Sequence, residues 1–138
     1  MATGEDHHTR IPFRQLVEHR CADVVQPDLH WCGGLTEALR IYYIAEAAGI
    51  KTSPHGGCNS PFGQHFCYAL PEVNYGEFHF STPVGIPLEE VVRIPGMAVP
   101  KDGYLVPSDA PGFGMEIKDE WITPWDHSAR AGEVLGVL

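Results

Sequence analysis

Four polar residues recur at a spacing that strongly constrains the fold of this chain: Glu5, Asp28, His55 and Glu77, separated by 23, 27 and 22 residues. Each lies at the end of a short strand-like run, and the spacing is about the length of one strand–helix unit. In a barrel or open sheet of parallel strands, functional side chains lie at the carboxyl ends of successive strands. The sequence therefore predicts an α/β fold in which these four side chains meet in one pocket.

The hydrophobic pattern of residues 1–80 predicts that helices and strands alternate. Apolar residues recur at helical spacing over 12–21 and 35–48, and a shorter helix is expected over 64–70. Short apolar runs predict strands at 24–25, 50–53 and 74–80, and the last of these carries Glu77. On the second helix, Glu37 and Arg40 are expected to face solvent as an i,i+3 pair. This alternation is typical of a parallel sheet covered by helices.

Beyond residue 81 the pattern changes, because six prolines between positions 83 and 111 interrupt any long element. We expect residues 81–118 to form an irregular tail with short strands that packs on the rest of the fold. Residues 119–138 are expected to form a carboxyl-terminal extension. The chain is thus divided into a strand–helix region at 1–80, the tail and the extension.

Charge and composition narrow the possible partners. With 138 residues and a net charge of −9, the chain has the size of one domain and lacks the positive charge that neutralises phosphates, so we expect no nucleic-acid partner. No apolar run approaches the roughly 18 residues of a membrane helix, and the first residues do not resemble a signal peptide. We therefore expect a cytoplasmic location. The four cysteines form no CxxC pair, which predicts reduced, partly buried thiols.

His55 and Asp28 suggest an acid–base pair. Adjacent strands lie about 4.8 Å apart, so a carboxylate at the end of one strand can accept the Nδ1–H of an imidazole at the end of the next. That hydrogen bond would fix the tautomer and leave Nε2 free as a base. Taken alone, Asp28 equally suits a turn after Pro27, and His55 a turn after Pro54.

The two glutamates suggest complementary roles in the same pocket. Glu5 is a candidate Mg²⁺ ligand, because Mg²⁺ prefers carboxylate oxygens. Taken alone, it is also compatible with an exposed acid near the start of the chain. Glu77 is placed to stabilise charge on a substrate oxygen or to protonate a leaving group.

Three segments together resemble the enolase superfamily, and within it the mandelate-racemase-like sugar-acid dehydratases of the L-rhamnonate dehydratase type. They are residues 4–9 (GEDHHT), 23–36 (DVVQPDLHWCGGLT) and 53–56 (SPHG). Residues 101–104 (KDGY) and 110–115 (APGFGM) resemble the tail of the same enzymes. The likeness extends over roughly residues 3–118.

The resemblance implies a fold and a reaction. The fold is a partial (β/α) barrel, formed by the last strand–helix units of a (β/α)7β barrel, with the irregular tail packing on the barrel or on a capping domain. The reaction is removal of the proton α to a carboxylate, followed by loss of water to give a 2-keto-3-deoxy sugar acid. Site roles follow by position: Glu5 is a ligand of Mg²⁺, His55 is the base, Asp28 orients it, and Glu77 bonds to the substrate carboxylate.

Two departures from this family limit what the resemblance implies. Asp6 stands where rhamnonate dehydratases often have histidine, which affects the sugar preference. The resemblance covers the last three barrel strands and the tail, whereas a whole barrel takes about 250 residues. The capping domain and two further Mg²⁺ carboxylates belong to other parts of the family fold. We therefore expect residues 1–138 alone to be inactive, and a full-length enzyme to be a homo-oligomer acting on an acid sugar.

Three alternatives stay open on sequence grounds. One is a racemase, or a dehydratase for another aldonic acid such as galactonate, fuconate or altronate. Another is a non-catalytic remnant of the barrel. The last is a small metal-binding module, although zinc sites usually place ligands in tight pairs. Its candidate ligands are His7, His8, His30, Cys32, His55 and Cys58.

Overall fold

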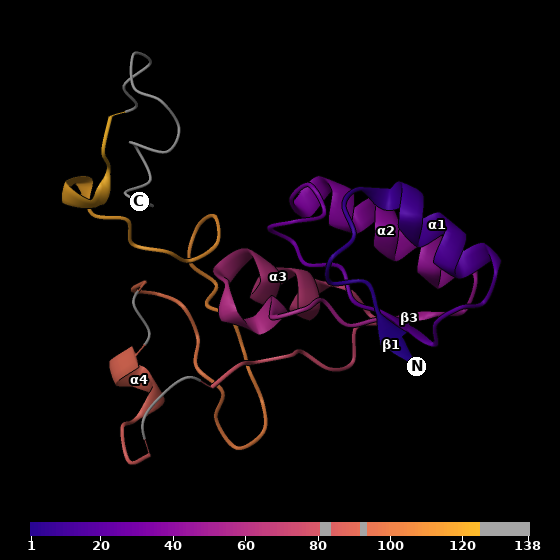
Figure 1. Ribbon diagram of the computed structural model, residues 1–138. Helices are drawn as coiled ribbons and strands as arrows, with labels where there is room; N and C mark the ends of the chain where they lie inside the picture. Colours follow the sequence, from indigo (N-terminus) through magenta and orange to yellow (C-terminus); the bar gives the residue numbers. More distant parts are fainter. Residues whose placement is uncertain (81–83, 92–93, 125–138) are drawn as a thin grey trace.

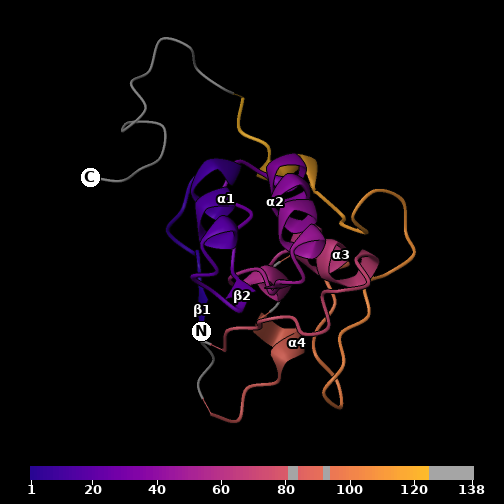
Figure 2. The ribbon, with the colours of Figure 1, turned by 90° about the vertical axis from the view of Figure 1, so that its right-hand side faces the viewer.

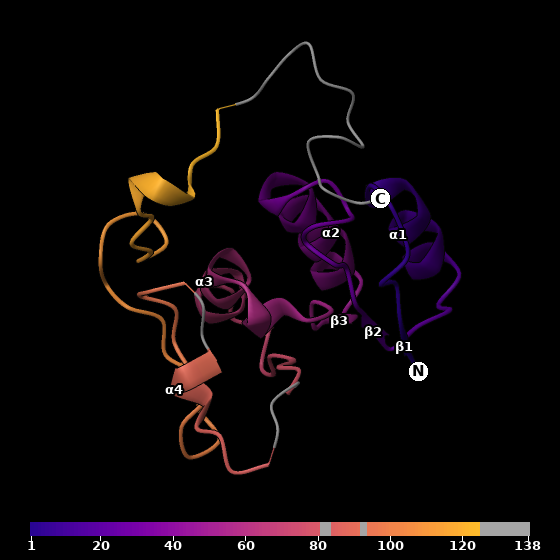
Figure 3. The same ribbon diagram turned by 60° about the vertical axis from the view of Figure 1, so that its left-hand side comes forward.

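A three-stranded parallel sheet forms the centre of the fold. The computed structural model describes residues 1–80, 84–91 and 94–124. The strands β1 (Ala2–Thr3), β2 (Val24–Val25) and β3 (Lys51–Thr52) pair in the order β1-β2-β3 (Figures 1 and 3). Val25 pairs with Thr3 on one side and with Thr52 on the other. The predicted α/β fold with a parallel sheet is confirmed.

Two helices lie side by side over the strands: α1 (Arg10–Glu18) and α2 (Leu35–Ala47) (Figure 2). Their buried faces and the strands form the main hydrophobic core, in which Phe13, Val25 and Ile41 are fully buried. Because every strand–helix unit runs strand first and helix second, each helix starts near the carboxyl edge of the sheet. The loops at that edge carry the predicted site residues.

The bounds of α1 differ from the predicted 12–21. Thr9 accepts a hydrogen bond from the Ile11 N–H at 3.4 Å, so the helix begins two residues earlier. At the other end, Arg20 takes a left-handed φ of +52°, and the Cys21 N–H donates to the Leu16 carbonyl at 2.9 Å. Cys21, which the predicted helix included and whose thiol was expected to be partly buried, therefore lies outside the helix and is exposed.

The α3 helix (Pro61–Ala69) follows a 3-10 turn, η1 (Gly57–Asn59), and starts three residues before the predicted position. Ser60 explains the earlier start, because its side chain accepts the Gly63 N–H at 3.2 Å while proline occupies the first helical position. Gln64, which is buried, links this helix to the tail through the Ala98 N–H and carbonyl, at 3.1 and 2.9 Å.

The predicted strand at 74–80 is wrong. The segment has no strand hydrogen-bond ladder, and its backbone is held by loop and side-chain groups instead. The Cys58 N–H donates to the Glu77 carbonyl at 2.9 Å, and the Ser53 hydroxyl to the Tyr75 carbonyl at 3.3 Å. These contacts still attach the segment to the loops that follow β3.

The described tail has little regular structure, as the prolines predict. It contains the short helix α4 (Leu88–Val91), an antiparallel bridge between Lys101 and Tyr104, and the 3-10 turn η2 (Asp119–Trp121). Of the predicted carboxyl-terminal extension, residues 125–138 lie outside the described residues. Within the described part of the chain, no helix combines the length and the apolar character needed to cross a membrane.

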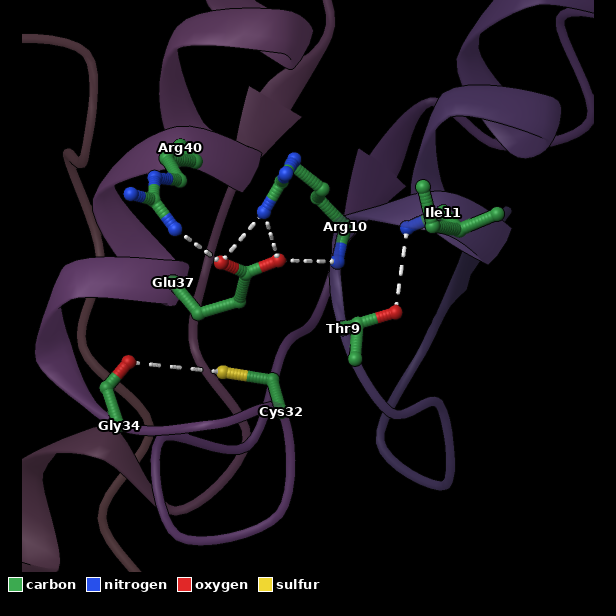
Figure 4. Close-up of polar contacts among 7 residues, drawn as sticks. All are labelled: Thr9, Arg10, Ile11, Cys32, Gly34, Glu37 and Arg40. Atoms are coloured by element: carbon green, nitrogen blue, oxygen red, sulfur yellow. Dashed lines mark hydrogen bonds and ion pairs between the residues drawn. The ribbon is translucent and has the colours of Figure 1, made fainter.

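Glu37 is buried, which corrects its expected exposure. Its side chain is 10% exposed and accepts hydrogen bonds from three donors (Figure 4). These are the Arg10 N–H and Nη1, each at 2.8 Å, and the Arg40 Nη1 at 2.9 Å. Only the Arg40 contact follows from helical spacing, whereas Arg10 comes from α1. Glu37 therefore links the start of α1 to α2.

These contacts predict a loss of stability in acid. The backbone hydrogen bond from Arg10, followed by the guanidinium of Arg40, lowers the pKa of Glu37 to about 2 from an ordinary value of 4.5. Because the folded pKa is the lower one, the stabilisation is complete above pH 4.5 and declines as the pH falls toward 2. Glu37→Gln should lower the melting temperature at neutral pH by several degrees. It should also reduce the fall in melting temperature between pH 4.5 and 2, which is the acid limb of the pH profile. Glu18→Gln, which removes an exposed ion pair with Arg14, is the matched control for thermal melts from pH 2 to 7. An unchanged acid limb in Glu37→Gln would contradict this assignment.

Candidate active site

The predicted site residues follow the strands at one edge of the sheet. Glu5 comes two residues after β1, and Asp28 and His55 come three residues after β2 and β3. The interval of 27 residues between the last two is also the register offset of β2 and β3, so they occupy matching positions. The His55 N–H donates to the Pro27 carbonyl at 3.2 Å, which continues the pairing beyond the strands.

The His55 imidazole lies between two carboxylates. Its Nδ1 is 3.1 Å from Oε2 of Glu5 and 3.2 Å from Oε2 of Glu77. Neither contact has the direction of a hydrogen bond, so Nδ1 is a buried nitrogen without a hydrogen-bond partner in this structure. The structure thus brings three of the four predicted residues together around one nitrogen atom.

Asp28 does not form the predicted hydrogen bond with His55. Its Oδ1 accepts the His30 N–H at 2.7 Å, and its carbonyl accepts the Cys32 N–H at 2.8 Å. The carboxylate therefore closes a local Asx turn, which is the alternative that the Pro–Asp sequence left open. Its backbone lies beside His55, but its side chain points into its own loop.

Glu77 is held as a carboxylate. Partial burial by itself raises the pKa of this group. This effect is outweighed by the Gly56 N–H, which donates to Oε2 at 2.6 Å, and by the imidazoles of His79 and His55. The pKa of Glu77 therefore lies below its ordinary value, and the side chain is ionised at neutral pH. In this state Glu77 accepts protons and hydrogen bonds and does not donate them. The role of protonating a leaving group, which the sequence suggested, requires the protonated form instead.

His79 is a member of the site that was missed in the sequence. Its Nε2 is 3.4 Å from Oε1 of Glu77, and its ring packs edge-on against His55 with centroids 5.2 Å apart. The sequence contains a pattern that predicts this contact, because residues two apart in an extended segment lie on the same side. The Glu77–His79 spacing therefore placed the second imidazole beside the carboxylate.

The oxygen donors fit part of a Mg²⁺ site. Mg²⁺ takes octahedral oxygen ligands, and typically one or two carboxylates complete its shell with water and substrate oxygens. Glu5 offers a carboxylate that is 54% exposed at the carboxyl edge of the sheet, and Glu77 lies across the His55 nitrogen from it. Glu5 therefore supplies a carboxylate of the kind that Mg²⁺ needs.

The cysteines do not contribute to this site. Cys32 is fully buried, and burial raises the pKa of its thiol to about 11 while Sγ contacts the Gly34 carbonyl (Figure 4). Among the described residues, the group of ligand atoms close enough to share a metal consists of His55, Glu77 and His79. The ligand set with His30, Cys32 and Cys58 that the sequence left open is therefore not assembled.

Comparison with known proteins identifies relatives of the chain. It is 36% identical over 132 residues to L-rhamnonate dehydratase of Saccharopolyspora erythraea, which corresponds to 92% of this chain and 33% of that protein. It superimposes on rhamnonate dehydratase of Gibberella zeae complexed with Mg with a TM-score of 0.72 and 33% identity, over 86% of this chain and 30% of the other. L-talarate dehydratase of Polaromonas, complexed with Mg and L-glucarate, gives a TM-score of 0.68 and 28% identity over 86% and 30%.

These comparisons agree with the parallel α/β fold. The chain spans about a third of the length of the relatives it matches. Those relatives are sugar-acid dehydratases by name, and two of the solved structures hold Mg. Residues 1–121, which include all four predicted site residues, match the enolase C-terminal domain-like family. The chain therefore belongs to the enolase C-terminal domain-like family.

Proposed function

We propose that this chain supplies the carboxyl-terminal part of the active site of a Mg²⁺-dependent sugar-acid dehydratase. The reaction removes the proton α to the substrate carboxylate and eliminates water, which yields a 2-keto-3-deoxy sugar acid. The observation that carries the proposal is the His55 imidazole, held between the carboxylates of Glu5 and Glu77 at the carboxyl ends of parallel strands.

In this proposal His55 moves the proton. Carboxylates cannot donate a hydrogen bond when ionised, so Glu5 and Glu77 favour the tautomer with its proton on Nδ1 and leave the Nε2 lone pair available. Once Nε2 has taken the α-proton, the adjacent carboxylate of Glu5 stabilises the imidazolium. The same imidazolium can then return its proton to the departing hydroxyl group.

The other residues hold and orient the reacting groups. Glu5 would be the ligand that this chain contributes to Mg²⁺, which when bound stabilises negative charge on the substrate carboxylate. Glu77 faces that carboxylate in the proposed complex, and the approach of a like charge raises the pKa of a glutamate toward the hydrogen-bonding form. Asp28 is proposed as a positioning residue, because a rotation of its side chain would exchange the His30 N–H for the Nδ1–H of His55.

The L-rhamnonate relatives support an L-rhamnonate-like substrate. Because a talarate dehydratase is also among the relatives, other acid sugars are candidate substrates as well. A racemase shares the first proton transfer and differs in the second, so it is the alternative within the same site. We propose in addition that the full-length enzyme is cytoplasmic and a homo-oligomer.

A chimeric enzyme tests this function. Residues 1–121 would replace the matching third of the Gibberella zeae rhamnonate dehydratase, and the product would be incubated with a panel of aldonic acids and Mg²⁺. We expect a 2-keto acid to form fastest from L-rhamnonate or one of its epimers. Exchange of the α-proton with deuterated water, without a keto product, would favour the racemase. A folded chimera that binds Mg²⁺ but catalyses neither exchange nor elimination would contradict the proposal.

The isolated polypeptide of residues 1–138 should not turn over sugar acids detectably. Its described site offers few carboxylates to a Mg²⁺ ion, and its outermost described strands, β1 and β3, each pair on one side within the described sheet. Calorimetry with MgCl₂ measures the binding of Mg²⁺ to the chain, and product assays at high protein concentration measure its turnover. Robust turnover by the pure 138-residue chain would contradict this expectation.

A further inference from the structure

We propose that His55, Glu77 and His79 form a binding site for a divalent transition metal of the Zn²⁺ class, separate in its ligand set from the proposed Mg²⁺ site. Their ligand atoms, one from each residue, all lie within 4.8 Å of one another. Two imidazoles and one carboxylate make a donor set suited to Zn²⁺, Co²⁺ or Ni²⁺, whereas Mg²⁺ prefers oxygen.

The contact of Glu77 with each imidazole is close to the spacing of neighbouring ligand atoms on a tetrahedral metal, with His55 facing one carboxylate oxygen and His79 the other. Zn–N and Zn–O bonds of about 2.0–2.2 Å at tetrahedral angles place neighbouring ligand atoms roughly 3.3–3.5 Å apart. The His55 Nδ1 and Glu77 Oε2 are 3.2 Å apart, and the His79 Nε2 and Glu77 Oε1 are 3.4 Å apart. The His55 Nδ1 is a buried nitrogen without a hydrogen-bond partner, although two carboxylates lie next to it. A metal ion at this position would satisfy it.

The backbone around the ligands is already fixed. The Gly56 N–H donates to Oε2 of Glu77 at 2.6 Å, which orients the carboxylate. Asn59 accepts the His79 N–H at 2.8 Å and donates to the His79 carbonyl at 3.1 Å. Because these contacts exist in the metal-free arrangement, little reorganisation is needed on binding. The His79 side chain is 53% exposed, so an ion can reach the site and keep a water molecule as its fourth ligand.

Binding at this site has a consequence for His55. A metal on Nδ1 leaves the imidazole proton on Nε2, and an imidazole with both nitrogens occupied is not a base. If the proposed function is correct, Zn²⁺ therefore inhibits the dehydratase by removing its base. The binding proposal itself does not depend on that function and is tested without any substrate.

The test titrates the metal-free 138-residue chain with ZnCl₂ in a calorimeter and with CoCl₂ in a spectrophotometer. We expect one ion per chain, and an intense visible Co²⁺ spectrum typical of tetrahedral coordination. Nitrogen NMR of the histidine rings should report binding through Nδ1 of His55 and Nε2 of His79. His79→Ala should weaken Zn²⁺ binding by more than about 100-fold, because loss of a ligand exceeds the 10–100-fold cost of losing an outer partner. Because the His79 side chain is 53% exposed, the substitution should leave the fold intact, and circular dichroism of the variant checks that it does.

Two control variants separate this site from other metal binding. The double variant His7→Ala/His8→Ala removes the adjacent histidine pair and should leave the affinity for Zn²⁺ unchanged. Glu5→Gln removes the proposed Mg²⁺ ligand, which is not one of the three proposed Zn²⁺ ligands, and should keep Zn²⁺ binding within a few-fold. Retention of full Zn²⁺ affinity in His79→Ala, or its loss in the His7/His8 variant, would overturn the proposal.

Discussion

Replacing His55 by asparagine in the chimeric enzyme should lower kcat by about 10²–10⁴-fold, the contribution expected of a general base. Asparagine keeps a polar side chain between Glu5 and Glu77 but cannot take a proton at the reacting carbon. Substrate binding should change much less, because His55 acts on the α-proton and does not carry the charge that holds the substrate. Steady-state kinetics on the best aldonic acid, with deuterium exchange as a second readout, measures the effect.

Two further variants make that result specific. His19→Asn alters a histidine at the carboxyl end of α1, which lies at the opposite edge of the sheet from the strand ends, and should leave kcat unchanged. Asp28→Asn keeps an oxygen that can accept the His30 N–H, so the Asx turn survives. A fall in kcat for Asp28→Asn would support its role in orienting His55, whereas an unchanged kcat would restrict it to the turn. A His55→Asn chimera with full activity would remove the base from the proposed mechanism.

The sequence predicts the architecture well where the evidence is local or periodic. The apolar stripe over 35–48 predicts α2 almost to its ends, and the 27-residue interval between Asp28 and His55 predicts the β2–β3 register. Both follow from repeating geometry, which a sequence contains directly. By contrast, Glu37 is buried by Arg10, a partner on another helix, and helical spacing carries no information about such a contact.

The errors within the site have the same origin. Strand spacing places Asp28 beside His55, but it does not determine which donor forms a hydrogen bond with the carboxylate. In the structure this donor is the His30 N–H of the same turn. The strand predicted for 74–80 is absent because loop groups take up its backbone hydrogen bonds. Even so, the two-residue spacing of Glu77 and His79 in this extended segment brings their side chains together. The sequence therefore does not determine which of several competing donors a side chain bonds to.

Phe13→Ala should strongly destabilise the fold. Phe13 is completely buried in the core between α1 and the sheet. Removing a buried aromatic ring costs about 3–5 kcal/mol, since the apolar contacts are lost and a cavity remains. The total stability of a domain of this size is about 5–15 kcal/mol, so the variant loses between about a fifth and all of it.

The same ring also supports the loop that carries Glu5, which extends the expected effect to the site. Gly4 takes a φ of +133°, and a Cβ there would lie 2.6 Å from the Phe13 ring, so the backbone before Glu5 rests directly on it. We therefore expect urea denaturation of Phe13→Ala to show a much lower midpoint, together with weaker Zn²⁺ binding in the fraction that stays folded. Phe80→Ala removes a ring that is 69% exposed and should change stability by less than about 0.5 kcal/mol. Equal midpoints for the two variants would mean that Phe13 does not anchor the core between α1 and β2.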